Sequence, residues 1–173
     1  MRLLRLLPLV LAAVLAAPSL AQAADVPSNK TLYADGPAGR FLVDGQWLFR
    51  LDAADQGVRR RFYRQTSTSG WSPVSVPNVW NVGDDSEASM RGSVGWYRKD
   101  FELPDKRAAL QWAVRFESVN YRSRVYLNGR EIGRNAGAYI PFQMHLDGLR
   151  KRGVNRLVVR VDSRRRCGRS RAR

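Results

Sequence analysis

Few residues in this chain could carry out nucleophilic, acid-base or zinc chemistry. His145 is the only imidazole and Cys167 the only thiol among 173 residues. A zinc site built from histidine and cysteine is therefore excluded within this chain, because such a site needs several of these ligands. A Ser-His-Asp arrangement would have to use His145, and a lone histidine between Met144 and Leu146 is more typical of a surface or packing residue.

The carboxylates offer few further candidates for catalysis or metal binding. Hydrolysis of a glycosidic bond needs two facing carboxyl groups roughly 5 to 9.5 Å apart. Glu102 and Glu117 fall on the polar sides of predicted strands, and Glu131 falls in a predicted hairpin, which are ordinary solvated positions. The run from Asp84 to Glu87 could offer oxygen ligands to Ca²⁺, but it lacks the regular spacing of a calcium loop, so a polar loop is favoured. We predict no catalytic residue, no metal site and no cofactor in this chain.

Aromatic residues are the other candidates for function. A sugar ring stacks well on an indole, so an exposed tryptophan would suggest a carbohydrate platform. Trp96 and Trp112 lie in or beside alternating segments, where core packing is the favoured role, whereas Trp71 and Trp80 stay open. The chain has five tryptophans in all: Trp47, Trp71, Trp80, Trp96 and Trp112.

The elements that must position these side chains are short strands. After Trp96, the residues Tyr97, Phe101 and Leu103 fall on one side of a strand, while Arg98 and Asp100 fall on the other, which predicts one face in a core and one in water. The same alternation runs through residues 110–116 and 155–162. These segments predict antiparallel strands that are each buried on one side.

Two Asx-Gly pairs predict tight turns between strands. Asn128-Gly129 can adopt the two positive φ angles of a type I′ turn, which predicts a hairpin over Val125–Gly133. A loop containing Gly137 and Pro141 follows it and cannot be helical. Asp44-Gly45 predicts a second hairpin, which would join two short strand-like runs, Phe41–Val43 and Gln46–Leu51.

The remaining segments carry weaker signals. Two prolines confine residues 71–77 to a sheet edge or to non-strand structure. Residues 52–65 have no clear pattern, and residues 146–151 can form one helical turn. No segment keeps a helical period over ten or more residues. Many short antiparallel strands separated by turns predict an all-β sandwich or jelly roll.

The two ends differ from the middle of the chain. Residues 1–23 have a basic start, an apolar run and a small-residue cleavage site, Ala21-Gln-Ala23, which predict an export signal and a periplasmic or secreted protein. Residues 24–40 are expected to form an extended lead-in, and residues 41–163 one domain. Residues 164–173 form an arginine-rich tail that does not resemble the domain before it.

The formal net charge of +15 is partly a property of these ends. Residues 24–163 hold 22 basic residues against 15 acidic ones, so the domain itself carries about +7. The charges are interspersed, which favours a solvated basic surface over a polyanion site. With a single cysteine, the domain has no internal disulfide and must be stabilised by its core.

Six segments stand in a distinctive order: Val76-Pro-Asn-Val-Trp80, Gly95-Trp-Tyr-Arg-Lys-Asp-Phe-Glu-Leu-Pro104, Phe116-Glu-Ser-Val-Asn120, Val125-Tyr-Leu-Asn-Gly129, Gly137-Ala-Tyr-Ile-Pro-Phe142 and Asn155-Arg-Leu-Val-Val-Arg-Val-Asp162. In order and spacing they resemble the N-terminal sugar-binding domain of glycoside hydrolase family 2. That family includes β-galactosidases, β-glucuronidases and β-mannosidases. The resemblance covers nearly the whole predicted domain.

The resemblance implies a galactose-binding-like jelly-roll β-sandwich without catalytic residues. In such enzymes an immunoglobulin-like domain and a TIM barrel follow, and the barrel carries two catalytic glutamates, one in an Asn-Glu motif. This chain has no Asn-Glu dipeptide. We therefore expect a product that is truncated or frame-shifted before the catalytic barrel, and whose jelly roll lacks its last strand or strands.

The resemblance also implies where sugar contacts would lie. We name Trp80, Asn135 and Tyr139 as candidate carbohydrate-binding residues. The family often has histidine where this chain has Asn135, and glycine where it has Ala138, which puts the contacts made by this loop in doubt. Tyr139 and Phe142 are favoured as anchors for domain packing.

Three functions remain in order of preference. The first is a non-catalytic sugar-binding domain of an exported β-galactosidase- or β-glucuronidase-like enzyme, with β-linked glycosides and the missing domains as partners. The second is a free-standing carbohydrate-binding module, against which an unpaired edge strand argues. The third is polyanion binding through residues 164–173. We expect no nucleic-acid partner and no membrane association after signal removal.

Overall fold

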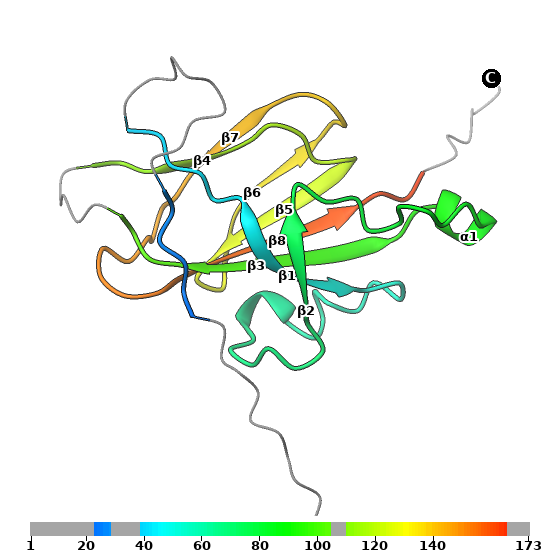
Figure 1. Cartoon of the computed structure of the whole chain (residues 1–173), viewed down its shortest axis with the longest axis horizontal. Coiled ribbons are helices and arrows are strands. Elements are labelled where there is room, and N and C mark those ends of the chain that lie inside the picture. Colours follow the sequence, from blue (N-terminus) through cyan, green and yellow to red (C-terminus); the bar gives the residue numbers. More distant parts are fainter. Residues whose placement is uncertain (1–22, 29–38, 105–109, 166–173) are drawn as a thin grey trace, which may run out of the picture.

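Two antiparallel β-sheets form the fold (Figure 1). The computed structural model describes residues 23–28, 39–104 and 110–165. The larger sheet has the order β2-β1-β3-β8-β5-β6, and the smaller one consists of β4 and β7. The larger sheet contains β1 (Gly45–Leu51), β2 (Ser72–Val76), β3 (Val94–Phe101), β5 (Arg122–Leu127), β6 (Arg130–Ala136) and β8 (Asn155–Asp162). The smaller sheet contains β4 (Ala113–Phe116) and β7 (Phe142–His145), and the two short helical turns are η1 (Phe62–Arg64) and α1 (Glu87–Met90).

The main core lies between the two sheets. Alternate residues of β3 and β8 enter it, as their pattern predicts. Tyr97 and Phe101 come from β3, and Leu157 and Val159 from β8. Phe116 and Phe142, paired partners in the small sheet, stack with ring centroids 4.9 Å apart and pack against this core. The prediction of an all-β antiparallel sandwich is confirmed.

The opposite face of the large sheet is also covered. Residues 52–71, which include η1, pack over it and bury a second cluster around Phe62, Trp71 and Trp96. Arg98 lies on this face and is only 2% exposed. The expectation that the polar side of β3 faces water is therefore wrong, because a segment without a clear sequence pattern covers that side.

The hairpin predicted at Asn128-Gly129 is confirmed. Both residues have positive φ, 49° and 83°, and they connect β5 to β6. The hairpin predicted at Asp44-Gly45 is wrong, since β1 pairs with β2 and β3 instead. Only Gly45 of that pair has a positive φ, so the double left-handed turn that closes a two-residue hairpin does not form there.

Three further expectations concern residues 72–76, residues 146–151 and helices that could span a membrane. Residues 72–76 form β2 at the edge of the large sheet, as two prolines require. Residues 146–151 contain one turn, closed by a hydrogen bond from Leu149 N to Leu146 O (3.2 Å), but no helix. Within the described residues no helix is long and apolar enough to cross a membrane. The predicted signal, apart from Ala23, and residues 166–173 of the tail lie outside the described residues.

Candidate functional site

Trp80 lies against the inner face of the large sheet. Its ring stacks on Phe49, with centroids 5.7 Å apart and planes 22° apart, and it also approaches Tyr97 at 6.3 Å. Below it lies Gly95, where an added Cβ would sit 3.3 Å from a Trp80 ring carbon. The half-buried indole is thus supported on one side by packing.

Asn135, on the edge strand β6, lies in the same cross-sheet row as Gly95 on the inner strand β3. The register runs from Gly95 on β3 to Val161 on β8, then Ser123 on β5 and Asn135 on β6. Three strand spacings of about 4.8 Å separate Gly95 from Asn135, or roughly 14 Å. Trp80, which packs over Gly95, and Asn135 therefore lie toward opposite sides of one end of the inner face.

Ser123 is the unexpected member of this row. Its residue is 3% exposed, and its hydroxyl oxygen has no hydrogen-bond partner. A buried hydroxyl without a partner is unfavourable and uncommon in folded proteins. It lies directly beside Asn135 across the β5-β6 ladder. A serine between Arg122 and Arg124 in β5 has no sequence signal that could have identified it.

Tyr139 follows β6 in the loop that leads to β7. Its side chain is 81% exposed, and the neighbouring Ile140 is 70% exposed. The loop itself is held in place, because Ser118 donates a hydrogen bond to Ala138 O (2.6 Å) and Gly137 N donates to Tyr121 O (2.8 Å). Tyr139 is therefore an exposed aromatic ring on an anchored loop.

The three predicted site residues lie in three different structural settings. Trp80 is half-buried by aromatic packing, Asn135 is half-buried on an edge strand, and Tyr139 is exposed on a loop. Asn135 and Tyr139 are four positions apart in the sequence, whereas the strand order leaves Trp80 across the sheet from them. Phe142, the other proposed anchor, uses its ring inside this domain by stacking on Phe116.

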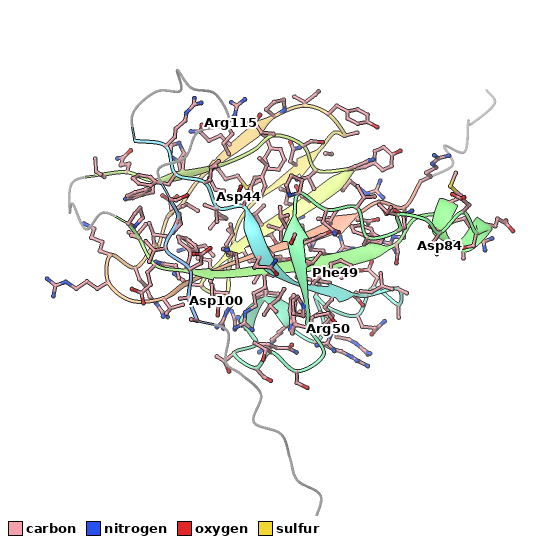
Figure 2. The ribbon with its side chains drawn as sticks, in the orientation of Figure 1. Asp44, Phe49, Arg50, Asp84, Asp100 and Arg115 are labelled. Carbon is pink, nitrogen blue, oxygen red and sulfur yellow. The ribbon has the colours of Figure 1, made fainter. Side chains whose placement is uncertain are left out.

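Asp100 organises the covered outer face (Figure 2). Its carboxylate accepts hydrogen bonds from Arg98 at 2.8 and 3.0 Å and from Arg156 at 2.7 and 2.8 Å. Burial raises the pKa of Asp100, but the hydrogen bonds from Arg156 and Arg98 outweigh it and hold the pKa at about 2. Both arginines also donate to backbone carbonyls of residues 65–67, so this carboxylate ties the covering segment to the sheet.

A second charged cluster lies toward the end of β8. Asp162 accepts hydrogen bonds from Arg122 (3.1 Å) and Arg164 (2.8 and 2.9 Å), and Asp55 accepts from Arg160 (2.7 Å). Burial raises the pKa of Asp162, but the bonds from Arg164 and Arg122 hold it well below its usual range. The predicted tail thus begins with a residue, Arg164, that is bound into the folded domain.

The remaining carboxylates predicted as possible ligands are engaged in local contacts. Asp84 accepts from Ser86 N (3.0 Å), and Glu87 pairs with Arg91 (3.0 Å) in α1. Among the residues that the structure describes, no three His, Cys, Asp or Glu side chains come together in a way that could hold a metal ion. His145 is exposed at the end of β7. The described charged groups therefore serve mainly to hold segments together.

Comparison with known proteins is consistent with this geometry. Residues 42–168 match the model of a family described as glycosyl hydrolases family 2, sugar binding domain. A putative β-glucuronidase of Formosa agariphila is 33% identical over 97 residues, which cover 55% of this chain and 12% of that protein. The β-galactosidase BoGH2A of Bacteroides ovatus is 29% identical over 137 residues, covering 73% of this chain and 16% of that protein.

Solved structures show the same relationship in three dimensions. A β-glucuronidase from an uncultured Clostridium aligns with a TM-score of 0.60 and 29% identity, covering 69% of this chain and 21% of that one. A Lactobacillus rhamnosus β-glucuronidase aligns with a TM-score of 0.61 and 25% identity, covering 69% of this chain and 20% of that one. The chain thus spans only about a fifth or less of the length of these proteins.

Proposed function

Because the chain belongs to glycosyl hydrolase family 2 through its sugar-binding domain, we propose that it is the non-catalytic sugar-binding domain of a β-glycosidase. The parent enzyme would be of the β-galactosidase or β-glucuronidase kind, as the names of its relatives suggest. Its catalytic glutamates would belong to a barrel domain outside these residues. The aligned part of this chain covers only 20–21% of the solved structures, which supports a separate domain for catalysis.

The observation that carries the non-catalytic role is the state of the buried carboxylates. A glycosidase needs a carboxylic acid with a raised pKa to protonate the leaving oxygen. In the described part of the chain two aspartates that arginines surround, Asp100 and Asp162, do the opposite. The pKa of Asp100 is held at about 2 and that of Asp162 is also lowered, in each case by arginine hydrogen bonds that outweigh burial. Groups fixed as anions by two or more arginines cannot act as the general acid.

We assign sugar contact to the end of the large sheet's inner face at which Trp80 and Asn135 lie. Trp80 offers an indole supported by Phe49, and Tyr139 offers an exposed ring on an anchored loop. Asn135, half-buried on β6 four residues before Tyr139, adds an amide. Apolar rings with a few placed polar groups are what a sugar needs for stacking and hydrogen bonding.

Export is part of the same proposal. The basic start, apolar run and small-residue site of residues 1–23 support removal of a signal and a periplasmic or secreted location. Fractionation of cells that express the chain with a C-terminal tag would test this. We expect a product that begins at Ala24 outside the cytoplasm, and an uncleaved cytoplasmic product would contradict it.

Two measurements test whether catalysis belongs to a separate domain. Purified chain should not hydrolyse chromogenic β-galactosides or β-glucuronides, and turnover that co-elutes with the pure protein would overturn the non-catalytic role. Sequencing of the gene beyond this coding region should reveal a barrel-encoding frame with an Asn-Glu dipeptide. The absence of such a sequence in every frame would overturn membership of a larger enzyme.

One observation favours a second candidate, a free-standing carbohydrate-binding module. Tyr139 and Ile140 are 81% and 70% exposed in this chain, so an aromatic and an aliphatic side chain are open to a ligand when no other domain covers them. This candidate requires that the chain by itself bind a β-linked polysaccharide. Affinity electrophoresis in gels containing such polysaccharides distinguishes the two, because a domain that needs its barrel should migrate unretarded.

A further inference from the structure

A second concave surface lies away from Trp80, Asn135 and Tyr139. It is a hollow of about 410 Å³ at the end of the small sheet, bordered by residues 110–112 and 145–151. His145 is the last residue of β7, whereas Tyr139 precedes the first residue of that strand, Phe142. The hollow and the Tyr139 loop are therefore at opposite ends of β7.

The two walls of the hollow are held by hydrogen bonds. Leu146 N donates to Trp112 O (2.8 Å) and so continues the β4-β7 ladder beyond its last strand pair. The loop after β7 is attached to the β5-β6 turn, because Asn128 Nδ2 donates to Gly148 O (3.2 Å). Arg150 N donates to the side chain of the fully buried Asn155 (2.8 Å). The surface is built on backbone that is fixed before any ligand arrives.

The lining combines apolar and polar groups. Trp112 is half-buried, with its ring 5.7 Å from that of Phe41, and Leu110 is 45% exposed. Gln111 and Asp147 are exposed beside them and supply an amide and a carboxylate. An apolar patch with a few polar groups that can each make two hydrogen bonds suits a sugar ring, which has apolar C–H surface and many hydroxyls.

Basic residues lie at one edge of the hollow, whose lining also includes the carboxylate of Asp147. Lys151 lines it, and Arg150 and Arg152 stand beside Lys151 on the same loop. Beyond the attached β5-β6 turn lie exposed Arg130 and Arg64, whose Nε donates to Gly129 O (3.3 Å). Within the described part of the chain, neither Arg130 nor Arg152 takes part in an ion pair. A net positive charge at this edge raises the local concentration of anionic ligands.

We propose that this hollow binds an acidic sugar, one that carries a carboxylate or a sulfate group, as part of a longer glycan. Trp112 and Leu110 contact the ring, Gln111 and Asp147 bind its hydroxyls, and Lys151 with Arg152 attracts its acidic group. The inference deepens the proposed sugar-binding function and rests on it. It would let the domain hold a charged polysaccharide at a point separate from the inner-face end.

Titration calorimetry on the folded full chain tests the ligand class. The probes are an oligogalacturonate, a sulfated galactose oligosaccharide, a neutral galactose oligosaccharide of equal length, and polyphosphate. We expect binding of one or both acidic sugars, at least about tenfold tighter than the neutral one or polyphosphate. The better of the two acidic sugars identifies the acidic group. Equal binding of polyphosphate, equal binding of the neutral sugar, or no binding at all overturns the proposal.

Matched variants localise the site. Combined Gln111→Ala and Asp147→Ala should weaken binding of the acidic sugar at least about fivefold, the effect of one or more lost hydrogen bonds. Combined Lys151→Gln and Arg152→Gln should remove the preference for acidic over neutral sugar. Gln143→Ala, which changes an exposed residue of β7 outside the hollow, should bind like the parent chain.

A charge control is also needed, because a basic chain attracts any polyanion. Combined Arg40→Gln and Arg91→Gln removes the same two charges from exposed positions outside the hollow. Equal loss of binding in this control and in the Lys151/Arg152 variant would overturn the proposal. Failure of the turnover and gene-sequence tests would leave a positive binding result standing, so the two proposals fail separately.

Discussion

Trp96 donates its indole N–H to the carboxylate of Asp52 at 2.9 Å, although the two residues are 44 positions apart in the chain. The same carboxylate accepts hydrogen bonds from the backbone N–H groups of Gln56 and Gly57, both at 2.8 Å. One aspartate thus shapes the start of the covering segment and attaches it to the most deeply buried ring of the sheet.

Replacement of Asp52 should be strongly destabilising. Asp52→Ala removes the acceptor for three N–H groups, two of which, those of Gly57 and Trp96, form their bonds in buried positions. Buried donors without partners cost about 1–3 kcal/mol each, so we expect a loss of roughly 2–4 kcal/mol after partial relaxation. Urea unfolding followed by tryptophan fluorescence measures it. Asp85→Ala, at an exposed loop position, is the control and should change stability by less than about 0.5 kcal/mol.

Two glycines offer a test of how tightly the outer cluster is packed. A Cβ on Gly57 would lie 2.4 Å from Trp96 Nε1 and 2.7 Å from an Asp52 oxygen, and neither group can move without breaking their hydrogen bond. Gly57→Ala should therefore cost about 1–3 kcal/mol.

Gly133→Ala is the matched comparison. The three atoms nearest to its added Cβ all belong to Met144, with the sulfur at 2.7 Å, and a methionine side chain is flexible. We expect a smaller loss than for Gly57→Ala in parallel urea titrations. Equal losses at the two positions would show that the region around Gly57 is not rigidly packed.

Asp100 should make stability depend on acid pH. Its pKa is about 2 in the folded domain, below the ordinary value of 3.8, so its contribution is present above pH 4 and is lost as pH falls toward 2. The difference of nearly two pKa units corresponds to about 2 kcal/mol. Urea unfolding between pH 2 and 5 should show this loss in the parent chain.

The Asp100→Asn variant separates this effect from general acid unfolding. It should be less stable at pH 6 and should have a shallower pH dependence between 4 and 2. Part of the dependence should persist, because the pKa of Asp162 is also lowered. An unchanged slope in the variant would mean that Asp100 does not contribute to acid stability.

Truncation of Trp80 and of Tyr139 should have different effects on the stability of the domain. Trp80→Ala deletes a ring that stacks on Phe49 and approaches Tyr97, so we expect about 3 kcal/mol of lost stability. Tyr139→Ala removes a side chain that is 81% exposed and should leave stability within about 0.5 kcal/mol. Thermal unfolding of both variants decides this, and a large loss for Tyr139→Ala would show that the loop has packing contacts that the structure does not show.

Local patterns were sufficient where a residue's neighbours in sequence determine its geometry. Asn128-Gly129 predicts its hairpin because a type I′ turn needs two adjacent positive φ angles, and both residues adopt them. Alternation in β3 and β8 predicts which side chains enter the main core. Two prolines restrict residues 71–77 to a sheet edge or to non-strand structure, and β2, which contains Pro73, is an edge strand.

The candidate site was predictable only in part. The motif order indicated Trp80, Asn135 and Tyr139, and the register shows that Asn135 shares a row with the buried Ser123. Nothing in the sequence indicated that Trp80 would lie across the sheet from them, because that depends on the strand order β3-β8-β5-β6. The hollow beside Trp112 is formed by two segments more than thirty residues apart and likewise has no local signature.

The sequence by itself determined several of the strands, the Asn128-Gly129 turn, and the side of β3 and β8 from which side chains enter the main core. Only the tertiary structure decided what covers each side. Arg98 and Asp100 alternate with apolar residues and were expected in water, but residues 65–67 and Arg156 surround them. Alternation reports the direction of a side chain, whereas its burial depends on distant segments that satisfy its charge.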